Sequence, residues 1–201
     1  GTPISALIGW IDRIDSHPED SQYIAKEMRS DMMRLEQIAD RFSQMGSQSP
    51  LEKLSLSKLI DGQVKYLKKR IPSLNKDTEF KIKIIDDIYI MGNSILLSWA
   101  LENLIRNAID SIKQQNGVVE LIVKIENGFG CIDIKDNGLG IDRKDWKNIF
   151  IPGFSSKKRG WGLGLSLVQR IIKEIHSGSI AVKSSSASDG TTFRIKLDQQ
   201  R

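Results

Sequence analysis

Apolar residues in the first 46 positions recur with the period of an α-helix. The first seam has spacings of three and four residues and comprises Ile4, Leu7, Ile8, Ile11 and Ile14. His17 and Pro18 interrupt it, and a heptad-like stripe follows over residues 21–45, comprising Met28, Met32, Leu35, Ala39 and Phe42. Two such helices joined by a short turn predict an antiparallel hairpin. Since a lone hairpin leaves both seams partly uncovered, we expect a second copy to complete a four-helix bundle; packing on the following domain is the alternative.

Small and polar residues separate this hairpin from the rest of the chain. Residues 46–50 read Gly-Ser-Gln-Ser-Pro and predict a boundary between a domain at 1–46 and a second at 51–201. Beyond it, the patterns predict strands at 54–56, 79–85, 87–91, 118–127, 130–136, 179–184 and 191–197. They predict helices at 57–70, with Ser57 as N-cap, at 94–114 and at 163–176, a turn at 128–130 and a serine-rich loop at 185–190. Strands mixed with three helices favour an α+β fold, a two-layer α/β sandwich with the helices on one side of the sheet.

Composition narrows the class of protein. The 201 residues are 39% hydrophobic and 27% charged, as in a soluble globular protein, and no apolar run is long enough to span a membrane. Cys131 is the single cysteine, which excludes a disulfide framework and predicts a small buried side chain in a strand. The net charge is +5, but the basic clusters at 65–70 and 157–159 lack the aromatic interleaving of a stacking platform, so we expect no nucleic-acid partner.

Two glycine-containing motifs predict a nucleotide site. Residues 136–141 read Asp-Asn-Gly-Leu-Gly-Ile directly after an apolar strand, which places a carboxylate and bare backbone against a flat polar ligand. Such an acid accepts a hydrogen bond from an exocyclic amine like that of adenine. Residues 160–165 read Gly-Trp-Gly-Leu-Gly-Leu and lead into an amphipathic helix, whose free backbone N–H groups face an anion. The first motif therefore suits a base and the second a phosphate chain.

A third motif lies on the predicted helix at 94–114. Asn103, Asn107 and Asp110 are spaced by four and three residues, so they project from one helical face. Amides on a partly buried face require polar partners, and amide oxygens are ligands that suit a hard cation such as Mg²⁺. The motif therefore predicts a metal-bound phosphate beside this helix.

With these motifs the chain resembles the sensor histidine kinases of two-component systems, within the GHKL ATPase superfamily that also holds gyrase and MutL. Residues 103–107 resemble the N box, 136–141 the G1 box, 150–157 the F box with its trailing lysine, 160–165 the G2 box and 190–193 the last strand's glycine-threonine motif. Each motif alone is weak, but all occur in the family's order within residues 51–198. The glycine spacing does not fit a Rossmann motif, and no Walker lysine motif occurs.

The resemblance implies the Bergerat ATP-binding fold, ATP and Mg²⁺ as cofactors, and a role for each matching residue. Asp136 would bind the adenine amine, with Thr191 assisting through water, and Asn107 would hold the Mg²⁺ with Asn103 beside it. The remaining ATP-binding candidates have three implied roles: Gly138 and Gly140 admit the base, Gly160, Gly162 and Gly164 form the lid and phosphate turn, and Lys157 and Lys113 supply positive charge. The further members of the set are Ile141, Ser156, Leu163, Leu165 and Asp110, and for Asp110 a surface pair or cap is the alternative.

The hairpin resembles the family's dimerisation and phosphotransfer domain, which implies a homodimer. Residues 1–4 are similar to the downstream end of the H box, so we expect the phosphoacceptor histidine just before Gly1. The chain would then bind Mg-ATP without phosphorylating itself, and in the intact protein the phosphoryl group would pass to that histidine and on to an aspartate of a response-regulator receiver domain. His17 and His176 lack the neighbours of the phosphoacceptor and are expected at the surface. Trp161 occupies a position at which the G2 box of the family commonly has a small residue.

Two other functions stay open. A GHKL domain can serve as a nucleotide-binding interaction module without phosphotransfer, and the absent phosphoacceptor favours that alternative. An ATP-hydrolysing enzyme of the gyrase type needs a glutamate base where this helix has Asn103, and Glu102 is one position away from that face. We expect a cytoplasmic location, without membrane contact in this segment, which also fits the cytoplasmic part of a membrane-anchored sensor.

Overall fold

The computed structural model describes residues 3–46, 50–70, 78–113, 116–155 and 162–200. The chain divides into two compact units, Gly1–Ser49 and Pro50–Arg201, each with its own internal packing. Across the described residues, no helix combines the length and the apolar character needed to cross a membrane.

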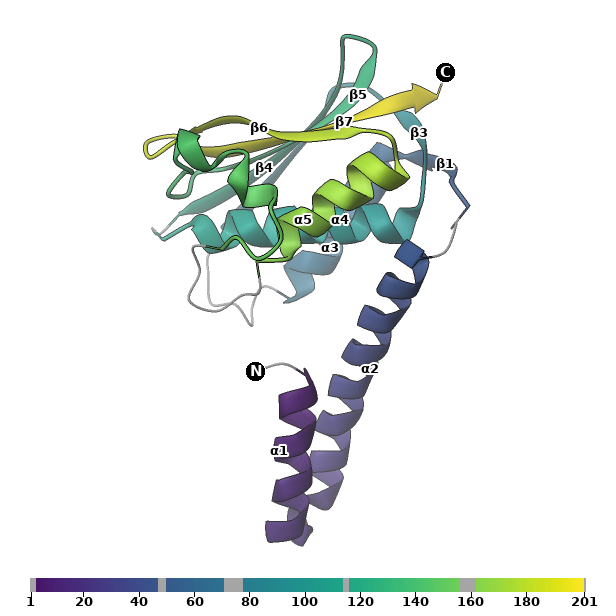
Figure 1. The fold of residues 1–201 in the computed structure, drawn as a ribbon, viewed down its shortest axis with the longest axis vertical. Helices are drawn as coiled ribbons and strands as arrows, with labels where there is room; N and C mark the ends of the chain where they lie inside the picture. The colour runs from purple at the N-terminus through teal and green to yellow at the C-terminus, as the bar shows by residue number, and fades with distance from the viewer. Residues whose placement is uncertain (1–2, 47–49, 71–77, 114–115, 156–161, 201) are drawn as a thin grey trace. The chain divides into compact units, whose positions relative to one another are not determined.

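The first unit consists of two helices joined by a short 3₁₀ turn (Figure 1). Helix α1 spans Pro3–Ser16, the turn spans Pro18–Asp20, and helix α2 spans Ser21–Gly46. The indole N–H of Trp10 donates to Asp31 Oδ2 at 3.2 Å, and the Trp10 ring meets Tyr23 edge to face. Ile24 is fully buried, whereas Met32 is 60% exposed. The helices therefore pack together, and the four-helix bundle stays a prediction.

The second unit is a sheet with helices on one face, which confirms the predicted two-layer sandwich (Figure 1). Within its described residues, seven strands form one sheet in the order β1-β3-β7-β5-β4-β2, and β6 pairs with β7. The strands are β1 Glu52–Ser55, β2 Thr78–Ile84, β3 Tyr89–Gly92, β4 Gly117–Glu126, β5 Phe129–Asp136, β6 Ser179–Ser186 and β7 Gly190–Gln200. The helices are α3 Leu56–Arg70, α4 Ser94–Ser111 and α5 Gly164–Arg170, which continues as a π-helical turn, Ile171–Ile175. The β2–β4 pair is parallel and the other strand pairs are antiparallel.

Strand β5 presents opposite chemistry on its two faces because side chains alternate along a strand. Ile132 and Ile134 are 1% and 0% exposed and belong to the core beneath the helices. Asp133 points to the other face, where Arg194 of β7 lies directly opposite in the register. Asp136 has the parity of Ile134, so it faces the helical layer. Cys131 is buried in this strand, as predicted.

Local turn and cap chemistry differs from two predictions. Strands β4 and β5 are joined by the two-residue turn Asn127-Gly128, with φ of 54° and 82°, whereas the sequence predicted residues 128–130. Positive φ at both positions matches a type I′ hairpin turn, and Asn-Gly is its preferred sequence. Helix α3 begins at Leu56, and Ser55 rather than Ser57 accepts the hydrogen bond from the N–H of Lys58, at 3.4 Å. Strands β6 and β7 also extend into the predicted 185–190 loop.

His176 is buried, so the prediction of a surface position was wrong, whereas His17 is exposed as predicted. The backbone N–H of Asn93 donates to His176 Nε2 at 3.0 Å, which leaves the proton on Nδ1, 2.8 Å from the Ile171 carbonyl. Asn93 also caps α4, because its Oδ1 accepts hydrogen bonds from the backbone N–H groups of Ile95 and Leu96 in the first turn of the helix. Burial lowers the pKa of His176, and the bond to Ile171 offsets only part of that shift. His176 therefore links the end of the α5 segment to the start of α4 as a neutral side chain.

Candidate functional site

Asp136 ends β5 and is only 2% exposed. Its Oδ1 atom accepts three hydrogen bonds: from Ser111 Oγ at 2.9 Å, from the N–H of Gly138 at 2.8 Å and from the N–H of Thr191 at 3.3 Å. Within the described part of the chain, no donor reaches Oδ2. One carboxylate oxygen is therefore fixed by the fold, and the other is available to a ligand.

Among the described residues, no cationic side chain bonds to the Asp136 carboxylate. Burial raises the pKa of Asp136, and the three hydrogen bonds to Oδ1 offset only part of that rise. The donors are neutral, so Oδ2 keeps an unsatisfied acceptor in a poorly solvated position. An external N–H group, such as an exocyclic amine, would satisfy it.

Three glycines allow the backbone to close around this carboxylate. A Cβ at Gly138 would lie 1.9 Å from Ser111 Oγ, and one at Gly190 would lie 2.0 Å from the Asp136 carbonyl oxygen. A Cβ at Gly140 would lie 2.4 Å from the Ser186 carbonyl oxygen. Gly140 and Gly190 also have φ of +78° and +74°, in the left-handed region that favours glycine. The glycines thus bring α4, β6 and β7 into direct contact with the turn after Asp136.

Ile141 and Thr191 are tied together by a serine that the sequence analysis missed. Ser185 Oγ accepts the N–H of Ile141 at 2.7 Å and lies 2.9 Å from Thr191 Oγ1. Trp146 Nε1 donates to the Ile141 carbonyl at 3.1 Å. The segment after Asp136 is therefore anchored to β6 and β7, with the buried Thr191 next to Asp136.

Helix α4 contributes the polar face predicted from its spacing. Asn103 and Asn107 are half-buried, and Asp110 and Lys113, which follows the helix, are exposed. Asn103 Nδ2 donates to the Trp99 carbonyl at 2.9 Å, which leaves its Oδ1 as the atom nearest to Gly164: a Cβ at Gly164 would lie 3.1 Å from it. The third glycine of the 160–165 motif is thus packed against the first asparagine of α4.

The described part of the second glycine motif forms a close backbone crossing. The N–H of Gly153 donates to the Gly162 carbonyl at 3.1 Å, and a Cβ at Gly162, where φ is +64°, would lie 2.5 Å from the Gly153 carbonyl carbon. Leu163 is 48% exposed and Leu165 is half-buried. The other predicted members of this region, Ser156, Lys157 and Gly160, and also Trp161, lie outside the described residues.

A cation at this site would rely on amide oxygens. The described residues hold no group of three or more His, Cys, Asp or Glu side chains suited to a metal. Asn103 and Asn107 offer hard oxygen donors, which fit a cation such as Mg²⁺ that takes its other ligands from phosphates and water. Glu102, one position from this face, is buried and ion-paired with Arg106 Nε at 3.1 Å.

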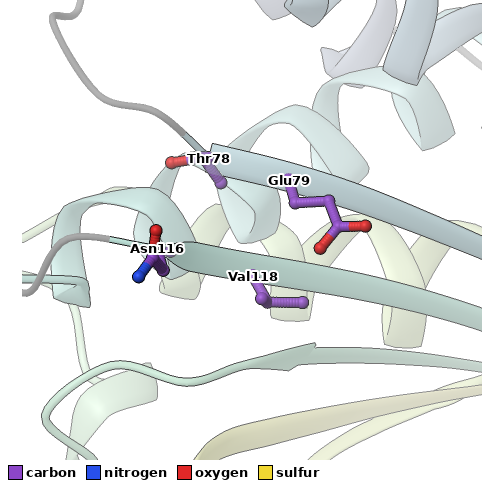
Figure 2. Close-up of a pocket in the computed structure, with 5 residues that line it drawn as sticks. Thr78, Glu79, Asn116 and Val118 are labelled. Atoms are coloured by element: carbon purple, nitrogen blue, oxygen red, sulfur yellow. The ribbon is translucent and has the colours of Figure 1, made fainter.

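A shallow cavity of about 390 Å³ lies apart from these residues (Figure 2). It is lined at the starts of β2 and β4 by Thr78, Glu79, Asn116, Gly117 and Val118. Its nearest link to the site is Asn137, whose Nδ2 donates to the Asn116 carbonyl at 3.1 Å and whose Oδ1 accepts the N–H of Val118 at 2.8 Å. None of the predicted site residues lines this cavity.

Ser111 is the second residue that the sequence analysis missed, and it carried a usable signal. It lies four residues after Asn107, so it continues the stripe of Asn103 and Asn107 by one further helical turn. For Ser185, within the run of serines at 184–186, no comparable signal exists.

Comparisons with known proteins identify what this arrangement is similar to. Residues 92–201 match the profile of the family described as Histidine kinase-, DNA gyrase B-, and HSP90-like ATPase. The chain is 30% identical to Sporulation kinase A of Bacillus subtilis (strain 168) over 98% of its own length, and 29% identical to the histidine-protein kinase AtoS of Escherichia coli (strain K12) over 97%. It spans 32% of the length of each of these relatives.

Two solved structures are similar in fold. The mycobacterial sensor histidine kinase MprB matches with a TM-score of 0.65 and 25% identity, covering 75% of this chain and 98% of that one. A complex of the histidine kinase ThkA with the response regulator TrrA matches with a TM-score of 0.65 and 20% identity, covering 99% of this chain and 58% of that one.

Proposed function

Because this chain belongs to the histidine kinase-, DNA gyrase B- and HSP90-like ATPase family, we propose that its second unit binds Mg-ATP, with the adenine amine donating to Asp136 Oδ2. One observation carries this proposal: a buried carboxylate has one oxygen held by three donors and the other without a donor among the described residues. Thr191, Gly138, Gly140 and Ile141 form the surroundings of the base.

The phosphate end of the nucleotide would lie along α4. Asn107 would hold the Mg²⁺ through its amide oxygen, with Asn103 beside it, and the ion when bound would neutralise charge on the phosphates. Gly164 keeps the backbone close to this face because it packs on Asn103, and Gly162 allows the backbone at its own position to cross closely over Gly153. Asp110, Lys113, Ser156, Lys157, Gly160, Leu163 and Leu165 complete the proposed ATP-binding set.

In the whole protein, the ATP-binding unit would serve as the catalytic domain of a sensor histidine kinase in the cytoplasm. The γ-phosphoryl group passes to a histidine outside this chain and then to an aspartate of a response-regulator receiver domain. The names of the relatives, Sporulation kinase A and the signal transduction histidine-protein kinase AtoS, support this proposal, as does the structure of the histidine kinase ThkA with a response regulator. We propose that α1 and α2 form the dimerisation and phosphotransfer domain, because the hairpin leaves apolar side chains such as Ile8, Ile11 and Met32 exposed.

Nucleotide binding is tested by calorimetric titration of the chain with Mg-ATP. We expect saturable one-site binding, and its loss in Asp136→Ala. Asp198→Asn serves as the control, since Asp198 is an exposed carboxylate on β7 and should leave the Kd unchanged. Absence of binding by the unmodified chain would contradict the proposal.

Phosphotransfer is tested on a protein extended upstream of Gly1, incubated with γ-labelled ATP and Mg²⁺. We expect label that is lost in acid and survives alkali, as phosphohistidine does, and that is absent from an Asn107→Ala variant. ATP binding without any label would instead support a nucleotide-gated interaction module.

A further inference from the structure

We propose that Ser111 is a positioning residue that sets the base specificity of this site: by holding Asp136 Oδ1, it leaves Oδ2 as the acceptor presented to the base. The inference rests on the proposed function, because it assumes that Asp136 meets the nucleobase. It assigns to the end of α4 a role in recognising a 6-amino purine, in addition to the role of its asparagines at the phosphates.

Ser111 is itself held from two sides. Its Oγ lies 2.7 Å from the Ala108 carbonyl oxygen and 2.9 Å from Asp136 Oδ1, so its single hydroxyl proton is shared between these two acceptors. Its backbone carbonyl accepts the N–H of Leu139 at 3.1 Å. The hydroxyl is therefore fixed relative to both α4 and the turn that follows Asp136. Such a donor can orient a carboxylate rather than follow it.

The three donors to Oδ1 come from three different parts of the fold. Ser111 is the last residue of α4, Gly138 lies in the turn after β5, and Thr191 is the second residue of β7. The two backbone N–H groups remain if the hydroxyl is removed, so Oδ1 would still be bonded, but the carboxylate would lose its only donor from the helical layer among the described residues. The plane of the carboxylate could then tilt more easily about the Cβ–Cγ bond, and the outer oxygen would be held less firmly in one direction.

The close packing of Ser111 against Gly138 also limits the space beside Asp136. Gly138 passes so close to Ser111 that a Cβ there would lie 1.9 Å from Oγ and 2.7 Å from the Ser111 Cβ. The hydroxyl thus lies in the room left by the glycine, and the backbone and Cβ of Ser111 would exclude a side chain at position 138 as well. The chemistry of Ser111 and the absence of a side chain at Gly138 are coupled.

An oriented acceptor discriminates between purines by whether the group at the 6-position of the base is a hydrogen-bond donor or an acceptor. The amine of adenine donates a hydrogen bond to Oδ2, whereas the carbonyl of hypoxanthine at the same ring position is an acceptor and repels it. A buried acceptor left without a donor costs more than a hydrogen bond gains, so an oriented carboxylate rejects the oxo base strongly. A carboxylate whose plane can tilt gives the amine a poorer hydrogen bond and can turn away from the oxo group, so it loses part of this discrimination.

The test compares the Kd values of Mg-ATP and Mg-ITP for the unmodified chain and for Ser111→Ala. We expect the unmodified chain to prefer Mg-ATP, and the ratio of the two Kd values to narrow about three- to tenfold in Ser111→Ala, mainly through weaker ATP binding. Ser16→Ala is the matched control, because Ser16 also ends a helix, with its hydroxyl bonded to the Asp12 carbonyl at 3.0 Å. It should leave the ratio unchanged.

Ser111→Cys guards against a loss of folding in the alanine variant, because the thiol has nearly the same size and is a weaker donor. In Ser111→Cys, the ratio of the Kd values of Mg-ITP and Mg-ATP should also narrow, by a smaller factor than in Ser111→Ala. If either variant weakens both nucleotides equally, Ser111 has only a structural role and the inference is overturned. If the unmodified chain binds Mg-ATP and the ratio is unchanged in both variants, the inference fails and the proposed function stands. Failure of the unmodified chain to bind Mg-ATP overturns the proposed function as well.

Discussion

Strand β5 carries two aspartates that are equally buried but differ in the face of the sheet on which they lie and in the charge of their hydrogen-bond donors. Asp133 and Asp136 are each 2% exposed, and they lie on opposite faces of the sheet. Asp133 receives Arg194 Nε and Nη2 at 2.5 and 2.6 Å and Lys183 Nζ at 2.9 Å. Arg194 also pairs with Glu126, so the open face of the sheet holds a network of alternating charges.

The pKa values of the two carboxyls move in opposite directions. Burial raises the pKa of Asp133, but the hydrogen bonds from Arg194 and Lys183 outweigh burial and hold the pKa below its ordinary value. Burial raises the pKa of Asp136, and its neutral donors do not compensate. A buried carboxylate with cations on both oxygens supports the fold, whereas one with neutral donors on a single oxygen is prepared for a ligand.

The largest expected effect comes from breaking the charged pair. Arg194→Met leaves Asp133 with Lys183 as its remaining cation, and we expect the free energy of unfolding to fall by about 3–5 kcal/mol because a buried charge loses its main partner. Urea denaturation measures this loss. Replacing both partners, as in Asp133→Leu with Arg194→Met, should recover much of it. A single variant as stable as the parent would contradict the structural role given to Asp133.

The second effect should appear in binding rather than stability. Asp136→Asn can keep Oδ1 and its three donors, but it replaces Oδ2 by an NH₂ group that faces the adenine amine with a donor. We expect the Kd of Mg-ATP to rise about 10- to 100-fold by titration calorimetry, since a hydrogen bond to a charged group is lost. The ligand-free protein should be as stable as the parent or more so. A loss of stability similar to that of Arg194→Met would remove the distinction between the two sites.

The smallest effect is the pH dependence of stability in the ligand-free protein. Because the folded pKa of Asp133 is lowered, its contribution is present above its ordinary value of 3.8 and is lost as the pH falls through the folded value. Because the folded pKa of Asp136 is raised, its contribution is present below 3.8 and is lost as the pH rises through the folded value.

Urea titrations at a series of pH values between 3 and 7 would separate the two contributions. The stability of Asp136→Asn relative to the parent should increase with pH, by about 1.4 kcal/mol for each unit of pKa shift removed. The stability of Asp133→Asn relative to the parent should decrease with pH over the acidic end of the series. The same sign for both variants would contradict the assignment.

The sequence was sufficient for those features that depend on local pattern. The apolar run at 131–134 predicts strand β5, and the spacing of Asn103 and Asn107 predicts a polar face on α4. What it missed depends on residues distant in the chain. The buried His176 accepts a hydrogen bond from Asn93, 83 positions away, and Ser111 contacts Asp136 across 25 positions. No periodicity in one segment reports such pairings.

The same limit applies to the hydroxyl groups of the site. Ser185 lies in a run of serines that favours a loop, yet the residue belongs to β6 and joins Ile141 to Thr191. A run of serines predicts an exposed segment. Composition alone does not tell which of the serines points toward the layer of helices.

The hairpin turn at Asn127-Gly128 has a consequence for how insertions and deletions would be tolerated. It sets the alignment in which Glu126 pairs with Phe129 and Ile122 with Asp133. A slip of β5 by one position would exchange the faces of all its side chains, sending Asp136 out to the charged face and Asp133 in toward α4. An insertion or deletion of one residue in this turn would therefore displace Asp136 from the site, although the turn is not among the residues proposed to bind ATP.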